Sequence, residues 1–174
     1  VAYSLTEFAA PFAGTVSLPA EAAKAMLLGV LRGISQAGFR RVCVINHHLE
    51  PAHFKLVHTA AAEAQAGTSV RIVVPDHRRK PTGPALGDEF MHGGSHAGCY
   101  ETSLMLAAAP HLVNDDVRRG LPTLEVDLPG AIKQGATNFL EAGGPDAYFG
   151  APAQATADEG RRLFAVIVAA TLEA

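Results

Sequence analysis

A short apolar segment at residues 41–45 lies between two helical patterns, and this alternation constrains the fold more than any other feature. Residues 19–36 carry apolar side chains at helical spacing, and residues 52–66 read as a second helix. Residues 70–74 are another apolar run of strand length. Strands that alternate with helices are typical of a parallel sheet whose strands are buried. We therefore expect an α/β fold in which all 174 residues form a single domain around a mostly parallel sheet flanked by helices.

The rest of the chain predicts one further strand, two helices and two loop-rich stretches. A helical run covers residues 104–109, and residues 155–172 close the chain as an amphipathic helix. Residues 121–128 are expected to form a strand. Residues 81–94 and 130–152 are rich in glycine and proline, so we expect the first to be a loop and the second to be mostly loop.

A His-x-Glu pair follows the first predicted strand, where α/β proteins collect reacting groups. His48 and Glu50 are two residues apart, so in an extended segment they point to the same side. Imidazole and carboxylate are ligand types that zinc, manganese and iron accept. A metal site is one interpretation. A solvated loop is the other, because a single His-x-Glu pair occurs by chance in many chains.

A second histidine lies in a glycine-rich turn. His96 is flanked by Gly93, Gly94 and Gly98, and a helical run begins shortly after it. Glycine allows close backbone approach, and a neutral imidazole near a helix N-terminus could carry protons. The alternative is that His96 is a turn or capping residue and Glu101 a first-turn carboxylate favoured by the helix dipole.

These two motifs resemble those of the creatininase (creatinine amidohydrolase) family. Residues 46–50 look like that family's N-G-H-x-E-N segment, and residues 96–103 look like its H-A-G-x-x-E-T-S signature. Residues 12–18 are similar to its F-P-G-T-I-S-L segment, and residues 149–160 are similar to the G-x-P-x-x-A-x-x-x-G stretch that opens its last helix. The order and spacing agree along nearly the whole chain.

The resemblance implies a three-layer α/β/α fold and a metal-dependent hydrolase that cleaves non-peptide C–N bonds. It implies a centre of two divalent metals (zinc, manganese or iron), in which His48 and Glu50 each bind one metal. His96 would be the catalytic acid or base. Glu101, five residues later on the following helix, is a further catalytic-site candidate that we expect to support His96 or the start of that helix. Residues 81–94 would be a loop or lid near the active site. The expected partners are a small cyclic or linear amide as substrate and further copies of the chain, with a hexamer as the family's usual assembly.

Part of the family's pattern is missing from this chain. No segment matches the family's first ligand block, E-x-H-G-x-H-L-P-x-x-x-D, and the chain begins with Val1 rather than methionine. We therefore expect that an N-terminal portion with the remaining ligands is absent, or that this is a shortened relative. A catalytically silent subunit or scaffold is the alternative function.

Several substitutions bear on the substrate. His47 replaces the usual glycine and Pro51 the usual asparagine of the first motif, while Ser95 stands where creatinine-hydrolysing members carry glutamate. The chain contains no tryptophan, whereas creatininase closes its substrate under tryptophan side chains. Creatinine is therefore expected to be a poor substrate.

Other polar residues near strand ends have two interpretations each. Asp76 and His77 follow the second strand and are either a turn or additional ligands, with the turn favoured. His53, in the first turn of the second helix, is close enough to the motif to support it. His58 is expected to be a surface or packing residue.

Composition excludes several classes of function. The formal net charge is −3, from 14 basic and 17 acidic residues, so nothing marks a nucleic-acid-binding surface. No apolar stretch approaches the roughly 20 residues needed to span a bilayer. Cys43 and Cys99 give neither a disulfide framework nor a zinc-thiolate spacing. We expect a protein of the reducing cytoplasm.

Overall fold

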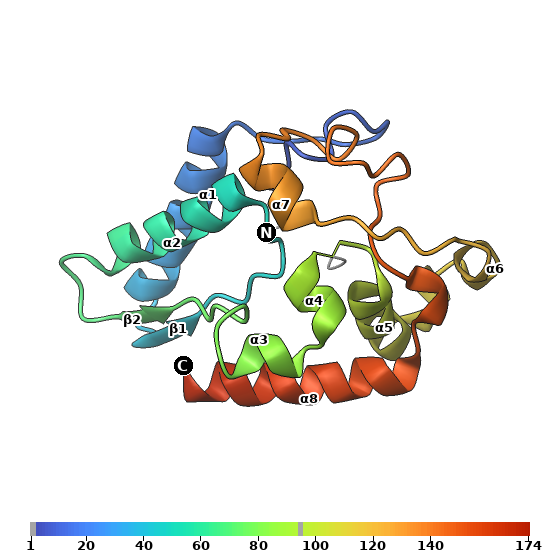
Figure 1. Cartoon of the computed structure of the whole chain (residues 1–174). Helices are drawn as coiled ribbons and strands as arrows, with labels where there is room; N and C mark the ends of the chain where they lie inside the picture. Colours follow the sequence, from blue (N-terminus) through green and yellow to red (C-terminus); the bar gives the residue numbers. More distant parts are fainter. Residues whose placement is uncertain (1–2, 94–95) are drawn as a thin grey trace. The chain divides into compact units, whose positions relative to one another are not determined.

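The computed structural model describes residues 3–93 and 96–174. Figure 1 shows the helices and strands along the chain. Val1, and the Gly94 and Ser95 positions singled out in the glycine-rich turn, lie outside the described residues.

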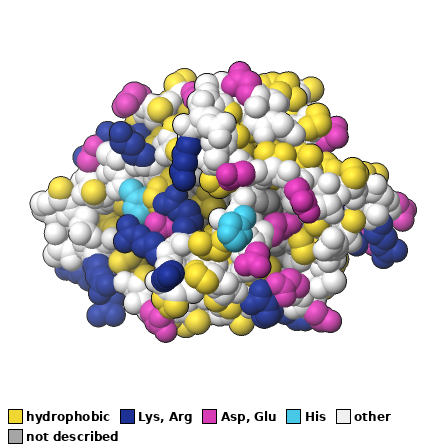
Figure 2. Space-filling view, in the orientation of Figure 1, with side chains coloured by type: hydrophobic (Ala, Val, Ile, Leu, Met, Phe, Trp, Pro, Cys, Tyr) yellow, Lys and Arg dark blue, Asp and Glu magenta, His cyan; other side chains and the backbone are white. Residues whose placement is uncertain are grey.

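The surface carries charges of both signs. Figure 2 shows basic and acidic side chains on the same face of the molecule, with apolar side chains exposed between them. This mixture agrees with a formal net charge of only −3. None of the helices in the described part of the chain has the length and apolar character needed to cross a bilayer.

The chain divides into two compact units, residues 1–75 with Ala174 and residues 76–173, and each is described by itself. In the first unit, helices alternate with strands in the order α1 (Ala20–Gln36), β1 (Arg41–Cys43), α2 (Pro51–Gln65) and β2 (Arg71–Val73). The two strands pair in parallel, with Val42 opposite Ile72. The α/β class and the parallel pairing are therefore confirmed.

Local sequence explains where α1 ends and where α2 begins. Helix α1 is rich in alanine and leucine, which are strong helix formers, and the chain leaves it through Gly38 at a φ of 94°. Pro51 occupies the first turn of α2, where its missing N–H has no intrahelical partner to lose. Lys24 of α1 forms an ion pair of 2.7 Å with Glu63 of α2.

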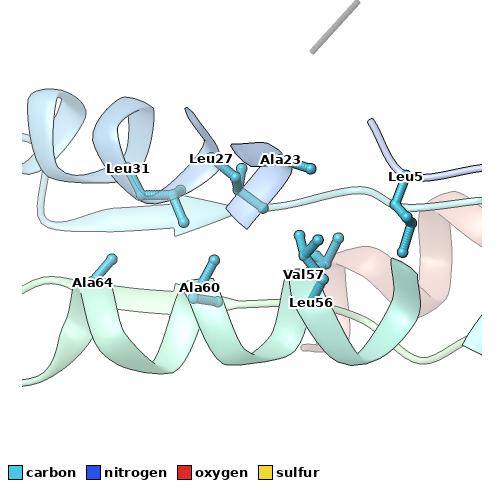
Figure 3. Close-up of a cluster of buried hydrophobic side chains, with 9 residues drawn as sticks. Leu5, Ala23, Leu27, Leu31, Leu56, Val57, Ala60 and Ala64 are labelled. Atoms are coloured by element: carbon cyan, nitrogen blue, oxygen red, sulfur yellow. The ribbon is translucent and has the colours of Figure 1, made fainter. Parts of the chain in front are cut away.

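Helices α1 and α2 share the apolar core of the first unit. Figure 3 shows Leu27 and Leu31 of α1 directed toward Ala60 and Ala64 of α2. Small alanine side chains on α2 leave room for the larger leucines, so the two helix faces complement each other in size. Half-buried side chains from the strand segments complete the core, namely Val42, Val44, Ile72 and Val74.

The expectation that both strands are fully buried is wrong. Val42 and Val44 pack against the core, whereas Arg41 and Cys43 are exposed and Ile45 is 64% exposed. Side chains of a strand alternate between the two faces of a sheet, so the helices of this unit cover one face only. An apolar run cannot by itself show how many layers cover a strand.

The second unit consists mainly of helices. They are α3 (Thr82–Ala85), α4 (Asp88–His92), α5 (Cys99–Ala108), α6 (Asp115–Arg119), α7 (Leu128–Lys133) and α8 (Ala157–Glu173), with 3₁₀ turns η1 (Pro110–Leu112) and η2 (Pro152–Gln154). The stretch 81–94, expected to be loop, thus contains two short helices, and Gly87 separates them at a φ of 101°. The stretch 130–152 begins inside α7, reaches the start of η2 and is mostly irregular between them, as expected.

The strand predicted at residues 121–128 is wrong. Only Leu124 pairs there, in an isolated antiparallel bridge with Gly150. Pro122 has no N–H to donate to a ladder, and Asp127 caps the next helix by accepting the Gly130 N–H at 2.9 Å. The segment therefore turns into α7 instead of continuing as a strand.

Helices α5 and α8 cross closely in the second unit, and a glycine allows this approach. A Cβ atom on Gly160 would overlap the Ser103 carbonyl oxygen and lie 2.8 Å from Ala107 Cβ. Ser103 also accepts the Thr156 N–H at 3.1 Å, just before α8 begins. Gly160 is the last glycine of the motif that opens this helix, and helix packing requires it.

We predict that Gly160→Ala lowers the free energy of unfolding of the second unit by about 3 kcal/mol, because the added methyl must displace backbone atoms of α5. Urea unfolding measures the change. The matched control is Gly29→Ala in α1, whose Cβ would meet no atom within 4 Å. That substitution should stabilise its helix by roughly 0.5–1 kcal/mol. Equal effects of the two substitutions would contradict the packing role of Gly160.

Candidate active site

The predicted metal-ligand pair lies on the segment between β1 and α2. His48 Nε2 is 3.4 Å from Glu50 Oε2, and Glu50 is only 8% exposed. The His48 Nε2 atom is buried and has no hydrogen-bond partner among the described residues. The structure thus brings the two side chains together, as their spacing predicts.

Asn46 organises the turn that carries this pair. Its Nδ2 donates to the His48 carbonyl at 3.0 Å, and its Oδ1 accepts the His48 backbone N–H at 3.2 Å. The same oxygen lies 3.1 Å from His53 Nε2, and Ser4 Oγ lies 2.9 Å from His53 Nδ1. Because an amide oxygen only accepts, His53 Nε2 carries the proton and Nδ1 accepts from the Ser4 hydroxyl.

His53 is a neutral, buried support for His48. The two rings meet edge to face with centroids 4.7 Å apart, and His53 is 6% exposed. Burial, and after it the neighbouring His48, lower the pKa of His53 to about 4. The ring is therefore uncharged at neutral pH and contacts the motif, in agreement with its expected position.

The Glu50 carboxylate also holds the beginning of the chain. Its Oε1 accepts the Glu7 N–H at 3.1 Å, and its Oε2 accepts the Phe8 N–H at 3.3 Å. Burial alone would raise the pKa of Glu50, but the contact with His48 and these two backbone hydrogen bonds outweigh it, and the pKa lies below its ordinary value. Glu50 is thus ionised and ties the segment of Glu7 and Phe8 to the motif.

The pair fits a divalent metal ion as part of a site. A buried imidazole nitrogen without a hydrogen bond and an ionised carboxylate oxygen beside it are suitable donors. In the part of the chain that the structure describes, no three His, Cys, Asp or Glu side chains gather as a donor set. His48 and Glu50 therefore supply two donors, and a complete site needs more.

His96 lies in the turn that leads into α5 of the second unit. The next residue, Ala97, has a φ of 51°, a left-handed conformation that costs a residue with a Cβ about 1–2 kcal/mol. Glu101 Oε2 accepts the Ala97 N–H at 2.7 Å, and Thr102 Oγ1 donates to the Ala97 carbonyl at 3.3 Å. Glu101 thus supports the turn beside His96, while a direct catalytic role for it stays a prediction.

Aromatic side chains line the His96 ring. Its centroid lies 4.3 Å from that of Phe139 and 6.5 Å from that of Phe149. The Phe149 N–H also donates to the His96 carbonyl at 2.9 Å. Both phenylalanines are buried, so they restrict the imidazole rather than offer a surface to a ligand.

Sequence reasoning does not identify Glu89 of α4, whose carboxylate lies at the start of α5 in the structure. Its carboxylate accepts three backbone N–H groups, from Cys99 and Tyr100 and from Ala151. These partners lie 10, 11 and 62 positions along the chain, so no short motif could have identified the residue.

Among the remaining polar candidates, Asp76 and His58 have structural roles. Asp76 Oδ1 accepts the Arg78 N–H at 3.2 Å, and the hydrogen bond from the Arg78 side chain lowers the pKa of Asp76, so the turn interpretation is confirmed. His77 is buried, and burial lowers its pKa. His58 packs its ring on Phe54 at 4.3 Å, as expected of a packing histidine.

A parallel sheet followed, after its first strand, by a half-buried imidazole and a buried carboxylate defines an α/β protein with a candidate metal site. A family model described as Creatininase: Creatinine amidohydrolase matches residues 1–174. The chain belongs to the creatininase family.

Relatives of known name agree with this assignment. The mycofactocin precursor peptide peptidase of Mycobacterium ulcerans (strain Agy99) is 31% identical over 171 residues, which are 97% of this chain and 60% of that protein. A solved manganese creatininase is 22% identical with a TM-score of 0.64, over 93% of this chain and 65% of that one. A mutant creatininase of Zn-Zn type is 20% identical with a TM-score of 0.62, over 98% and 70%. The solved structures show the fold, and the chain spans 60% of the length of the mycobacterial relative.

Proposed function

We propose that this protein is a metal-dependent hydrolase that cleaves the C–N bond of an amide, with a divalent metal held in part by His48 and Glu50. The observation that carries the proposal is the buried His48 Nε2, which faces Glu50 Oε2 at 3.4 Å and has no hydrogen bond within the described residues. A buried nitrogen beside an ionised carboxylate oxygen offers two donors to a cationic ligand. Membership of a family with manganese and zinc forms supports a metal as that ligand.

The chain's own residues have distinct roles in the proposed reaction. When bound, a divalent metal supplies Lewis-acid polarisation of a carbonyl and lowers the pKa of a water. His48 and Glu50 hold the ion, and Asn46 and His53 fix the backbone and ring of His48. The resemblance of the motifs gives His96 the role of acid or base, which is worth about 10²–10⁴-fold in rate.

Two classes of amide are candidates for the substrate. A small cyclic or linear amide follows from the resemblance of the motifs. A peptide bond is the second candidate, favoured by a 31% identical relative named as a precursor peptide peptidase. Both are acyl C–N bonds that call on the same groups, so only the parts of the site that bind the rest of the substrate distinguish them. With no tryptophan in the chain, creatinine is disfavoured.

A catalytically silent subunit is the alternative function. Two observations support it. Both oxygens of Glu50 already accept backbone N–H groups, and within the described residues no third metal donor joins His48 and Glu50. In this alternative the motif serves to hold Glu7 and Phe8 in place, and no amide is cleaved.

The first prediction concerns metal. Protein prepared without chelator should hold at most one weakly bound zinc, manganese or iron ion per chain through these donors, and His48→Ala should weaken its binding more than roughly 10-fold, because a donor to the ion is lost. Elemental analysis after dialysis, with titration calorimetry, measures both. His58→Ala, in the same unit, is the matched control and should leave the metal in place. Unchanged metal in His48→Ala would exclude His48 as a ligand.

The second prediction concerns catalysis. His96→Ala should keep the metal and lower kcat on a cleaved amide by roughly 10²–10⁴, since a positioned proton carrier is removed. The exposed His111 provides the control, and His111→Ala should leave kcat unchanged. A panel of creatinine, small amides and short peptides, followed by release of the amine, identifies the substrate class. Metal-loaded protein that cleaves no member of the panel would favour the silent subunit.

The third prediction concerns assembly. We propose that the chain forms a homo-oligomer, a hexamer by family resemblance, because Cys43 and Ile45 are exposed on the uncovered face of a sheet of two short strands. Exposed strands of this kind pair or pack with other chains unless covered. Sedimentation at micromolar concentration should show a mass above that of the 18.1 kDa monomer. A monomer at all concentrations tested would contradict this part of the proposal.

A further inference from the structure

We infer that Glu89 is the residue that positions His96, although it belongs to a different helix and no motif includes it. This inference rests on the proposed function of His96, but its geometry can be tested without any activity. Three hydrogen bonds of the Glu89 carboxylate carry it. Two come from the start of α5, and the third comes from Ala151, which lies two residues after Phe149, a hydrogen-bond partner of His96.

Glu89 supplies the N-terminal cap that α5 otherwise lacks. The N-cap residue, Gly98, has no side chain, and the first N–H groups of a helix have no intrahelical acceptor. Glu89 Oε1 accepts the Cys99 N–H at 3.0 Å, and Oε2 accepts the Tyr100 N–H at 2.7 Å. A carboxylate here is also favoured by the helix dipole, so these bonds fix the direction in which α5 begins.

The third bond of Glu89 reaches a distant part of the chain. Oε1 also accepts the Ala151 N–H at 2.7 Å. Two residues earlier, the Phe149 N–H donates to the His96 carbonyl at 2.9 Å. The short segment from Phe149 to Ala151 is therefore tied twice to the turn and helix start, once directly at His96 and once through Glu89.

The turn of His96 depends on α5 for its shape. Ala97 keeps its left-handed conformation because Glu101 and Thr102, both in α5, bond its N–H and carbonyl. A displaced helix start would carry these two side chains with it and release the turn. Phe139 and Phe149 contact the His96 ring, but the backbone of the turn sets the position of the Cα and Cβ atoms from which the ring extends. Glu89 is thus a positioning residue and need not contact the substrate.

The test is Glu89→Gln, which keeps the size of the side chain but replaces one acceptor oxygen by an NH₂ group that cannot accept an N–H. In the full chain we expect the His96 ring signals in ¹H–¹⁵N spectra to move, and amide exchange at Cys99, Tyr100 and Ala151 to accelerate about 10-fold or more, as expected for a weakened cap. Unchanged His96 signals in a folded Glu89→Gln protein would overturn the inference.

Asn114→Ala is the matched control. Asn114 caps α6 in the same unit by accepting the Val117 N–H at 3.3 Å, so its loss removes a cap without contact with the His96 turn. It should leave the His96 signals and the three amides unchanged. Changes as large as those of Glu89→Gln would show that any loss of a cap disturbs the unit, and would also overturn the inference.

Two further measurements separate the possible failures. If an amide substrate is found, Glu89→Gln should lower kcat roughly 10-fold with KM nearly unchanged, since misplacement of a proton carrier affects the transition state. If no activity exists, the spectra alone decide the positioning role. Should Glu89→Gln fail to fold, native-state hydrogen exchange of the unaltered chain replaces it, and Cys99, Tyr100 and Ala151 should open together. Three different opening free energies would contradict a shared acceptor.

Discussion

Carboxylates that accept backbone N–H groups hold together the parts of this protein on which its motifs depend. Glu50 binds the amides of Glu7 and Phe8, Glu101 binds that of Ala97, and Glu89 binds three amides at once. Each bond is charge-assisted and therefore stronger than one between neutral groups. The chain uses them where a segment has no ladder or helix of its own to satisfy its N–H groups.

Both histidine motifs are fixed by hydrogen bonds from nearby side chains to their backbone. In the first unit, the Asn46 side chain bonds both the N–H and the carbonyl of His48. It also sets the tautomer of His53, whose ring contacts that of His48. In the second unit, a strained Ala97 is held from the helix that follows it. Strain of this kind persists only where the surroundings determine it fully, as they do here, and it is typical of functional sites.

The sequence predicts the periodic elements well and the long-range contacts poorly. The bounds of α1 and α2 follow from helical spacing, Gly38 and Pro51, because these signals are local. Burial of β1 could not be read from Val42 to Ile45, since covering both faces of a strand depends on other layers. The strand predicted around Leu124 was overridden by Pro122 and by the cap of α7.

The same reasoning applies to the candidate site. The spacing of His48 and Glu50 predicts their contact, and a turn around Asp76 is predicted by its residue type. Nothing local predicts Glu89, because it joins two segments that are distant in sequence.

Glu50 and His48 differ in what their removal would disturb. Glu50 both faces the candidate metal site and anchors Glu7 and Phe8, so its removal would disturb fold and metal together. His48 Nε2 makes no hydrogen bond within the described residues, and His96 has its backbone held by other residues. Substitutions of these two imidazoles therefore separate chemistry from folding in a way that substitution of Glu50 cannot.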